Sequence, residues 1–341
     1  MVAEISLGMV GVSPGNGHPY SFASIVNGYS DEGFERADWD VIHDYLRAKD
    51  ASEFGFPGVE VTHAWTQDET ETRKLCDAAR IPNAVDELGD LRDAVDAVVL
   101  ARDDYESHAE MAMPFLEAGT PVFLDKPLTL DEEELAAFRP YLEDGRLMSC
   151  SGMRYARALD EPRAHLDRFG DAKLVRGTVI NDWPKYGAHM LDAIFGLLDQ
   201  RPVAVETAPA ADGLATDRPA ADGPATDGPA TDESGGVSAG NDHTSVSIRM
   251  DGGTLVQVDT LGDAPMTFSV DLYGTDRTGH YELRDNFTAF RRTLYRFVEM
   301  VRTGEPRLAP EETLDVIRTL VAGRRADEQD RRVSIAEVGE P

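Results

Sequence analysis

The stretch Ile5–His18, ISLGMVGVSPGNGH, decides the fold, because an apolar run ends there in a glycine-rich turn. Phe22, Ile25 and Val26 follow at helical spacing. A strand, a glycine turn and a helix start predict a dinucleotide-binding unit, since glycines let the backbone approach a pyrophosphate at the helix N-terminus. The candidate cofactor-binding residues of this turn are Gly11, Ser13, Gly15 and Gly17. Ser13 stands where a second glycine is expected, so a tight turn without a ligand remains an alternative interpretation.

Strand and helix signals continue to alternate through the first third of the chain. Strands are expected at Val59–Trp65, Ala94–Ala101 and Pro121–Leu124, with helices at Glu69–Arg80 and His108–Ala118. This alternation predicts right-handed crossovers and a parallel, doubly wound α/β sheet. The aromatic and acidic residues 28–58 are interpreted as an irregular insertion.

The pattern changes after Pro127. The expected elements are a helix at 130–142, a short strand at 147–150, a helix at 158–169, a strand at 174–181, a helix at 185–198, strands at 244–250, 254–261, 267–273 and 280–283, and helices at 287–302 and 310–327. Glycine turns between the later strands indicate antiparallel hairpins. We therefore expect a Rossmann domain over residues 1–127 and an α+β domain over 128–341 with a mostly antiparallel open sheet.

One segment of the second domain repeats a five-residue unit. Residues 209–233 read PAADG, LATDR, PAADG, PATDG and PATDE. A period of five matches neither helix nor strand, and Pro and Gly disfavour both. We interpret residues 209–242 as a disordered acidic insertion, with a partner-docking arm as the alternative.

The charge balance of the 341 residues is strongly acidic. There are 33 Lys+Arg against 63 Asp+Glu, a net charge of −30, and only five of the basic residues are lysines. This field disfavours binding to nucleic acid or to an anionic membrane surface. Many carboxylates and few lysines favour a halophilic protein in a high-salt cytoplasm over an ordinary acidic one.

Other features agree with a cytoplasmic protein. Two cysteines are too few for a disulfide framework or a four-thiolate zinc site. The first residues lack the basic stretch and apolar run of a signal peptide, and no apolar run approaches the length of a membrane span.

Three places in the sequence carry candidate cofactor-binding or catalytic residues. Thr66 and Asp68 follow the second strand, where an acid that binds the cofactor ribose is expected. Thr66 takes the expected place of that acid, so the sequence does not distinguish NAD from NADP. Lys126 follows the strand at 121–124, where ligands of α/β sheets bind, and a lysine there can relay a proton. On the helix at 185–198, Lys185, His189 and Asp192 share one face. Lysine is a poor zinc ligand, so no metal is expected.

Several of these motifs resemble the glucose–fructose oxidoreductase, inositol dehydrogenase and rhizopine-catabolism family (Gfo/Idh/MocA). The strand followed by Asp125-Lys126-Pro127, the stretch Ser151–Tyr155, the segment Gly187–Asp192 and the closing helices carry the likeness, which spans nearly the whole chain. The resemblance implies NAD(P)-dependent hydride transfer on a sugar, polyol or sugar acid. It also implies catalytic roles for Lys126 and His189 and a homo-oligomer, dimer or tetramer, formed through the open sheet.

Substrate contacts are expected from Lys185, Asp192, Arg154 and Tyr155. Lys185 stands where the family commonly has Asp. If it faces Lys126, two ammonium groups share the site and favour an anionic substrate. Alternatively, Lys185 pairs with Asp182 or Asp192 and is structural. The altered glycine turn also keeps a second class of function open, a non-catalytic ligand-sensing or partner-binding protein with the same fold.

Overall fold

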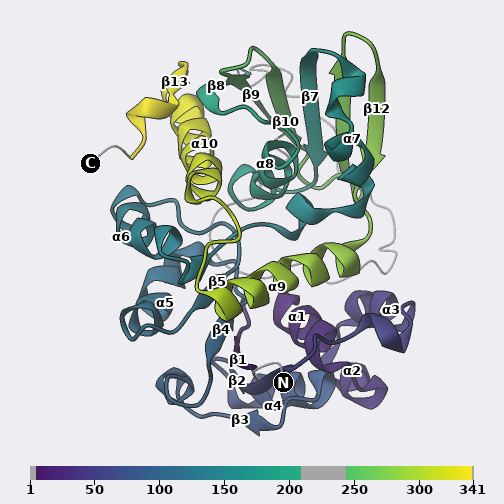
Figure 1. The fold of residues 1–341 in the computed structure, drawn as a ribbon, viewed down its shortest axis with the longest axis vertical. Helices are drawn as coiled ribbons and strands as arrows, with labels where there is room; N and C mark the ends of the chain where they lie inside the picture. The colour runs from purple at the N-terminus through teal and green to yellow at the C-terminus, as the bar shows by residue number, and fades with distance from the viewer. Residues whose placement is uncertain (1–4, 209–242, 340–341) are drawn as a thin grey trace, which may run out of the picture.

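The computed structural model describes residues 5–208 and 243–339, which form two sheets with helices packed around them (Figure 1). The acidic insertion expected at residues 209–242 lies outside the described residues. Within those that are described, no helix is both long enough and apolar enough to cross a membrane.

The first sheet is parallel and has the order β3-β2-β1-β4-β5-β6. Its strands are β1 Ile5–Val10, β2 Val59–Trp65, β3 Asn83–Ala84, β4 Ala97–Leu100, β5 Val122–Leu124 and β6 Leu147–Met148. The helices that join them are α1 His18–Asn27, α4 Glu69–Ala79, α5 His108–Glu117 and α6 Glu132–Glu143. The predicted doubly wound fold is confirmed. The domain boundary at residue 127 stays a prediction, and β6, which follows it, extends the first sheet.

The expectation that residues 28–58 are irregular is wrong. They contain α2 Asp31–Ala37 and α3 Asp40–Arg47. The Ser30 side chain accepts a hydrogen bond from Gly33 N and so caps α2. Trp39 and Ile42 lie against Gly17, where an added Cβ would be 2.4 Å from Ile42 Cδ1. The insertion therefore packs on the glycine turn, and only a residue without a side chain fits beneath it.

The second sheet has the order β12-β11-β7-β10-β9-β8-β13. Its strands are β7 Ala172–Val179, β8 Pro202–Thr207, β9 Thr244–Met250, β10 Leu255–Thr260, β11 Phe268–Gly274, β12 Thr278–Glu282 and β13 Val333–Ser334. Only β7 and β10 pair in parallel. The mostly antiparallel sheet is confirmed, with β8 and β13 as strands that we did not expect. The helix expected at 158–169 shrinks to α7 Asp160–Ala164 between 3-10 turns.

Three long or central helices connect this sheet to the first. Helix α8 Ala188–Phe195 covers the inner face, where Gly177 of β7 lies against Met190. Helix α9 Asn286–Thr303 crosses between the two sheets in Figure 1. Its Phe290 packs edge-on against Phe22 of α1, 5.1 Å between ring centres. Helix α10 Pro310–Gln329 packs against β8 and α8. The second domain thus packs, through these helices, against the carboxyl ends of the first sheet's strands.

Candidate active site

The glycine turn after β1 leaves room above Gly15. This residue has φ +73°, and an added Cβ would meet no atom within 4 Å. Gly11, in contrast, has no room for a side chain, because a Cβ there would lie 2.2 Å from Pro19 Cγ. Ser13 is buried, and its hydroxyl donates to Asp103 Oδ1 at 2.7 Å. The turn therefore packs tightly at its base and is open to a ligand at its tip.

Thr66 and Asp68, the cofactor-binding residues predicted at the end of β2, make hydrogen bonds to residues close to them in the chain. The Thr66 hydroxyl donates to Asp68 O, and the Asp68 carboxylate accepts from the backbone N–H groups of Thr70 and Glu71 at the start of α4. Both side chains shape the loop before α4, and neither makes a hydrogen bond to the described residues of the glycine turn. That contact is made by Gln67, which we did not predict: its Nε2 donates to Val12 O at 2.6 Å.

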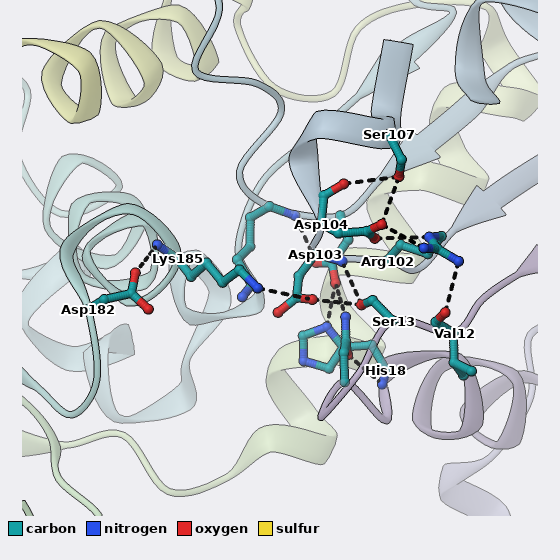
Figure 2. Close-up of polar contacts among 12 residues, drawn as sticks. Val12, Ser13, His18, Arg102, Asp103, Asp104, Ser107, Asp182 and Lys185 are labelled. Carbon is teal, nitrogen blue, oxygen red and sulfur yellow. Dashed lines mark hydrogen bonds and ion pairs between the residues drawn. The ribbon is translucent and has the colours of Figure 1, made fainter. Parts of the chain in front are cut away.

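Arg102, after β4, completes this side of the site. Its Nη1 donates to Val12 O and to Gln67 Oε1, both at 2.8 Å. Its Nε and Nη2 donate to Asp104, whose second partner is the Ser107 hydroxyl (Figure 2). A buried guanidinium thus ties three strand ends together below the turn.

The end of β5 carries Lys126 and a buried carboxylate. Lys126 is 4% exposed, and its Nζ lies 5.6 Å from the centre of the Tyr186 ring. Asp125 accepts from the Lys126 N–H at 2.9 Å and lies 2.5 Å from His18 Nδ1. Burial would raise the pKa of Asp125, but the His18 imidazole and Lys126 outweigh burial and hold that pKa below its ordinary value. Asp125 is therefore a carboxylate, and its charge faces His18.

His189 and Asp192 project from α8 toward the loop after β6. His189 Nδ1 is 2.6 Å from Ser151 Oγ, and Asp192 Oδ2 accepts from Ser151 N at 2.7 Å. Burial lowers the pKa of His189 well below 6.5, and the nearby Lys126 and His18 lower it further. Burial also raises the pKa of Asp192, against the hydrogen bond from Arg154. His189 is consequently a neutral imidazole beside an ammonium group.

Lys185 departs from the predicted arrangement. The helix expected at 185–198 begins as a π-helical turn, Trp183–Gly187, and only α8 is regular. The Lys185 Nζ lies 3.9 Å from Asp103 Oδ1, and its backbone N–H donates to Asp182 (Figure 2). The alternative pairing of the ammonium with Asp182 or Asp192 is therefore wrong, since its partner is Asp103, in the loop after β4 of the first sheet.

Arg154 and Tyr155, two expected substrate-binding residues, lie apart from Lys126. Arg154 is 5% exposed, and its Nε donates to Asp192 Oδ1 at 2.9 Å while its Nη1 pairs with Glu312. Both residues line a separate cleft of about 530 Å³ that includes neither Lys126 nor His189. The structure thus brings Lys126, His189 and Asp192 together. Arg154 contacts Asp192 from the side of the separate cleft.

Sequence reasoning missed five polar residues of this site: His18, Gln67, Arg102, Asp103 and Ser151. Each directly follows a strand, a turn or a short loop at the carboxyl edge of the first sheet. The rule that ligands of α/β sheets bind beyond that edge would have indicated them. In the described part of the chain, no three His, Cys, Asp or Glu side chains are grouped to hold a metal ion.

Comparison with protein families gives one match. Residues 41–143 match the model described as an oxidoreductase family with an NAD-binding Rossmann fold. No curated protein matches the chain.

Solved structures are similar over nearly the whole chain. The scyllo-inositol dehydrogenase of Lactobacillus casei, with NAD(H) and scyllo-inositol bound, has a TM-score of 0.70 and 13% identity and covers 98% of this chain and 99% of its own. The myo-inositol dehydrogenase of the same organism, in complex with NAD(H) and myo-inositol, has a TM-score of 0.71 and 14% identity, covering 99% and 98%. A myo-inositol dehydrogenase of Corynebacterium glutamicum has 0.69 and 12%, covering 97% and 98%. At such identities the likeness establishes the fold.

Proposed function

We propose that this chain belongs to the Gfo/Idh/MocA oxidoreductase family, whose NAD-binding Rossmann model matches residues 41–143, and that it transfers hydride between NAD and the CH–OH group of a sugar or polyol. The observation that carries the proposal is the convergence of Lys126 and a neutral His189 beside the glycine turn. An ammonium group and a neutral imidazole are the two groups needed to bind a hydroxyl and to accept its proton.

The glycine turn fits the cofactor. Open space above Gly15 and the N-terminal end of α1 suit a pyrophosphate, because a helix N-terminus attracts anions. We assign the adenosine ribose to the end of β2, where Gln67 donates to Val12 O of the glycine turn. NAD, when bound, would supply the hydride chemistry, and this chain supplies position and charge.

Lys126 binds the substrate oxygen in the proposed reaction. Its position at the end of a rigid, buried strand holds the ammonium group toward Tyr186 and the His189 side of the site. Its positive charge stabilises the developing alkoxide as the C–H bond weakens. We assign no other donor of this kind, since Lys185 is already paired with Asp103.

His189 takes the hydroxyl proton. The Ser151 hydroxyl oxygen accepts from Met153 N, and it also accepts from His189 Nδ1–H in the proposed tautomer. This leaves Nε2 as the proton acceptor. The Tyr186 and Phe268 rings, each 5.6 Å from the imidazole centre, keep water from it. Asp192 holds the loop through Ser151 N and is a positioning residue.

We propose neutral polyols or sugars as substrates over sugar acids. The Asp103 carboxylate offsets the second ammonium group that would have favoured an anion. The related Lactobacillus casei structures hold scyllo-inositol and myo-inositol, which are neutral. The open sheet as an oligomer face, a cytoplasmic location and a halophilic character remain part of the proposal. A non-catalytic sensor does not account for Lys126 beside a neutral His189.

The proposal is tested by titrating NADH, followed by fluorescence, in concentrated KCl. A panel of inositols, sugars and aldonates is then assayed for NAD reduction. We expect saturable NADH binding and turnover with at least one neutral polyol. NADH binding without turnover on any member of a broad panel would favour the sensor instead.

A further inference from the structure

A second cleft, separate from Lys126 and His189, has an unusual charge. It lies between α9, the turn before α7 and the segment that leads into α10, and it has a volume of about 530 Å³. The basic residues that line it are Arg154, Arg163, Arg292, Arg296 and Arg307. Only two carboxylates, Asp160 and Glu312, line it as well. Five positive charges gather here in a chain whose net charge is −30.

The two carboxylates of the cleft are already paired with arginines of the same cleft. Asp160 accepts two hydrogen bonds from Arg292, at 2.8 and 2.9 Å, and a longer one from Arg163. Glu312 pairs with Arg154. Both carboxylates of the cleft therefore already pair with arginines, namely Arg292, Arg163 and Arg154. The cleft keeps an excess of positive charge.

Several guanidinium atoms have no partner. Among the described residues, Arg296 makes no hydrogen bond or ion pair, and Arg154 Nη2 and Arg307 Nε are buried without a hydrogen-bond partner. Arg154 is 5% exposed, so its unused donor lies in the wall of the cleft. Burial lowers the pKa of Arg163, and Asp160 only partly compensates. Unpaired buried donors and uncompensated charge are costly without a ligand.

We propose that this cleft binds a small polyanion that carries phosphate or carboxylate groups. Guanidinium groups pair with both in bidentate geometry, and several arginines from different segments suit more than one anionic group. The volume is that of a small-molecule site, and Tyr155 and Tyr295 add aromatic surface at its wall. The ligand is distinct from the hydride-transfer substrate, whose site holds Lys126 and His189.

The test measures binding of potassium pyrophosphate and of potassium citrate to the full chain by calorimetry, at constant ionic strength set with KCl. We expect at least one of them to bind once per chain. Binding of pyrophosphate alone identifies a phosphate ligand, and binding of citrate alone a carboxylate. The variant Arg296→Gln/Arg307→Gln removes the guanidinium group of Arg296, which has no partner among the described residues, and that of Arg307, whose Nε has none, and we expect it to weaken binding at least about tenfold.

Two further variants distinguish binding in this cleft from a general effect of net charge and from binding in the glycine turn. Arg284→Gln/Arg324→Gln changes the net charge equally at exposed positions outside the cleft and should bind as the wild type does. Gly15→Asp places a carboxylate in the glycine turn, at a backbone conformation that Asp tolerates, and should abolish NADH binding while the polyanion still binds. Absent binding in the wild type, equal loss in both double variants, or loss only in Gly15→Asp would each overturn the proposal.

Discussion

Asp103, just after β4, and Lys185, in the π-helical turn before α8, pair across the two sheets with 3.9 Å between Oδ1 and Nζ (Figure 2). Asp103 also accepts the Ser13 hydroxyl, at 2.7 Å. One carboxylate therefore joins the glycine turn to the segment that carries His189. We expect this pair to set how much positive charge a substrate meets beside Lys126.

We expect Asp103→Asn to change substrate preference. Without the carboxylate, the Lys185 charge is uncompensated and attracts an anionic substrate. The ratio of kcat/KM for an aldonate to that for a neutral polyol should rise at least about fivefold. Asp103→Asn/Lys185→Met should restore the wild-type ratio. An unchanged ratio in the single variant would mean that Lys185 does not face the substrate.

Lys126→Met should reduce turnover by at least about a hundredfold, as loss of an acid–base or oxyanion-binding group does. Lys126→Arg should also fail, because a planar guanidinium does not reproduce the ammonium geometry. Lys173→Met, at an exposed position, is the control and should keep full activity. NADH binding should persist in all three. Normal turnover in either Lys126 variant would refute the assignment.

The pKa of His189 predicts a difference in acid stability. That pKa is below 6.5 in the folded protein, so below pH 6.5 the unfolded chain binds a proton that the folded chain does not. The free energy of unfolding should therefore fall as pH drops below 6.5, by at most about 1.4 kcal/mol per pH unit from this group. His189→Gln should lose less stability in urea unfolding from pH 7.5 to 5.5. Buried His108 contributes with the same sign to both proteins and cancels. Parallel pH curves would contradict the prediction.

The first turn of α4 predicts a preference for NAD over NADP. Asp68, Glu69 and Glu71 place carboxylates directly after β2, where the 2′-phosphate of NADP would lie. NADH should bind at least about tenfold more tightly than NADPH. Gln67→Arg should narrow the difference by offering the phosphate a cation. Tighter binding of NADPH by the wild type would show that these carboxylates do not face the ribose.

The charge balance predicts a dependence on salt. With 63 acidic and 33 basic residues, acid–acid repulsion should weaken as KCl screens it. The melting temperature should rise by roughly 10 °C from low to molar KCl. Scans in potassium acetate at matched ionic strength check that screening is responsible. A melting temperature independent of KCl would exclude a halophilic character.

Local sequence determined most of the first sheet. The apolar runs of β1, β2 and β4 and the glycine turn predict strands and a crossover, because strand formation depends on alternation along the chain. The same rule indicates Lys126, directly after a strand. The helices α2 and α3 were missed because their aromatic and acidic residues show no continuous apolar face in the sequence. In the structure, Phe34 of α2 and Leu46 of α3 are buried in the same core.

The partnerships within the site were decided by the tertiary structure alone. His18 and Asp125 are 107 positions apart in the chain, and Asp103, in the loop after β4, meets Lys185, in the π-helical turn before α8. Periodicity along the chain indicates which face of an element is buried, but it does not indicate which strand ends meet. The pairing of Lys185 and the neutrality of His189 depend on those contacts, because Coulomb interactions and burial act through space.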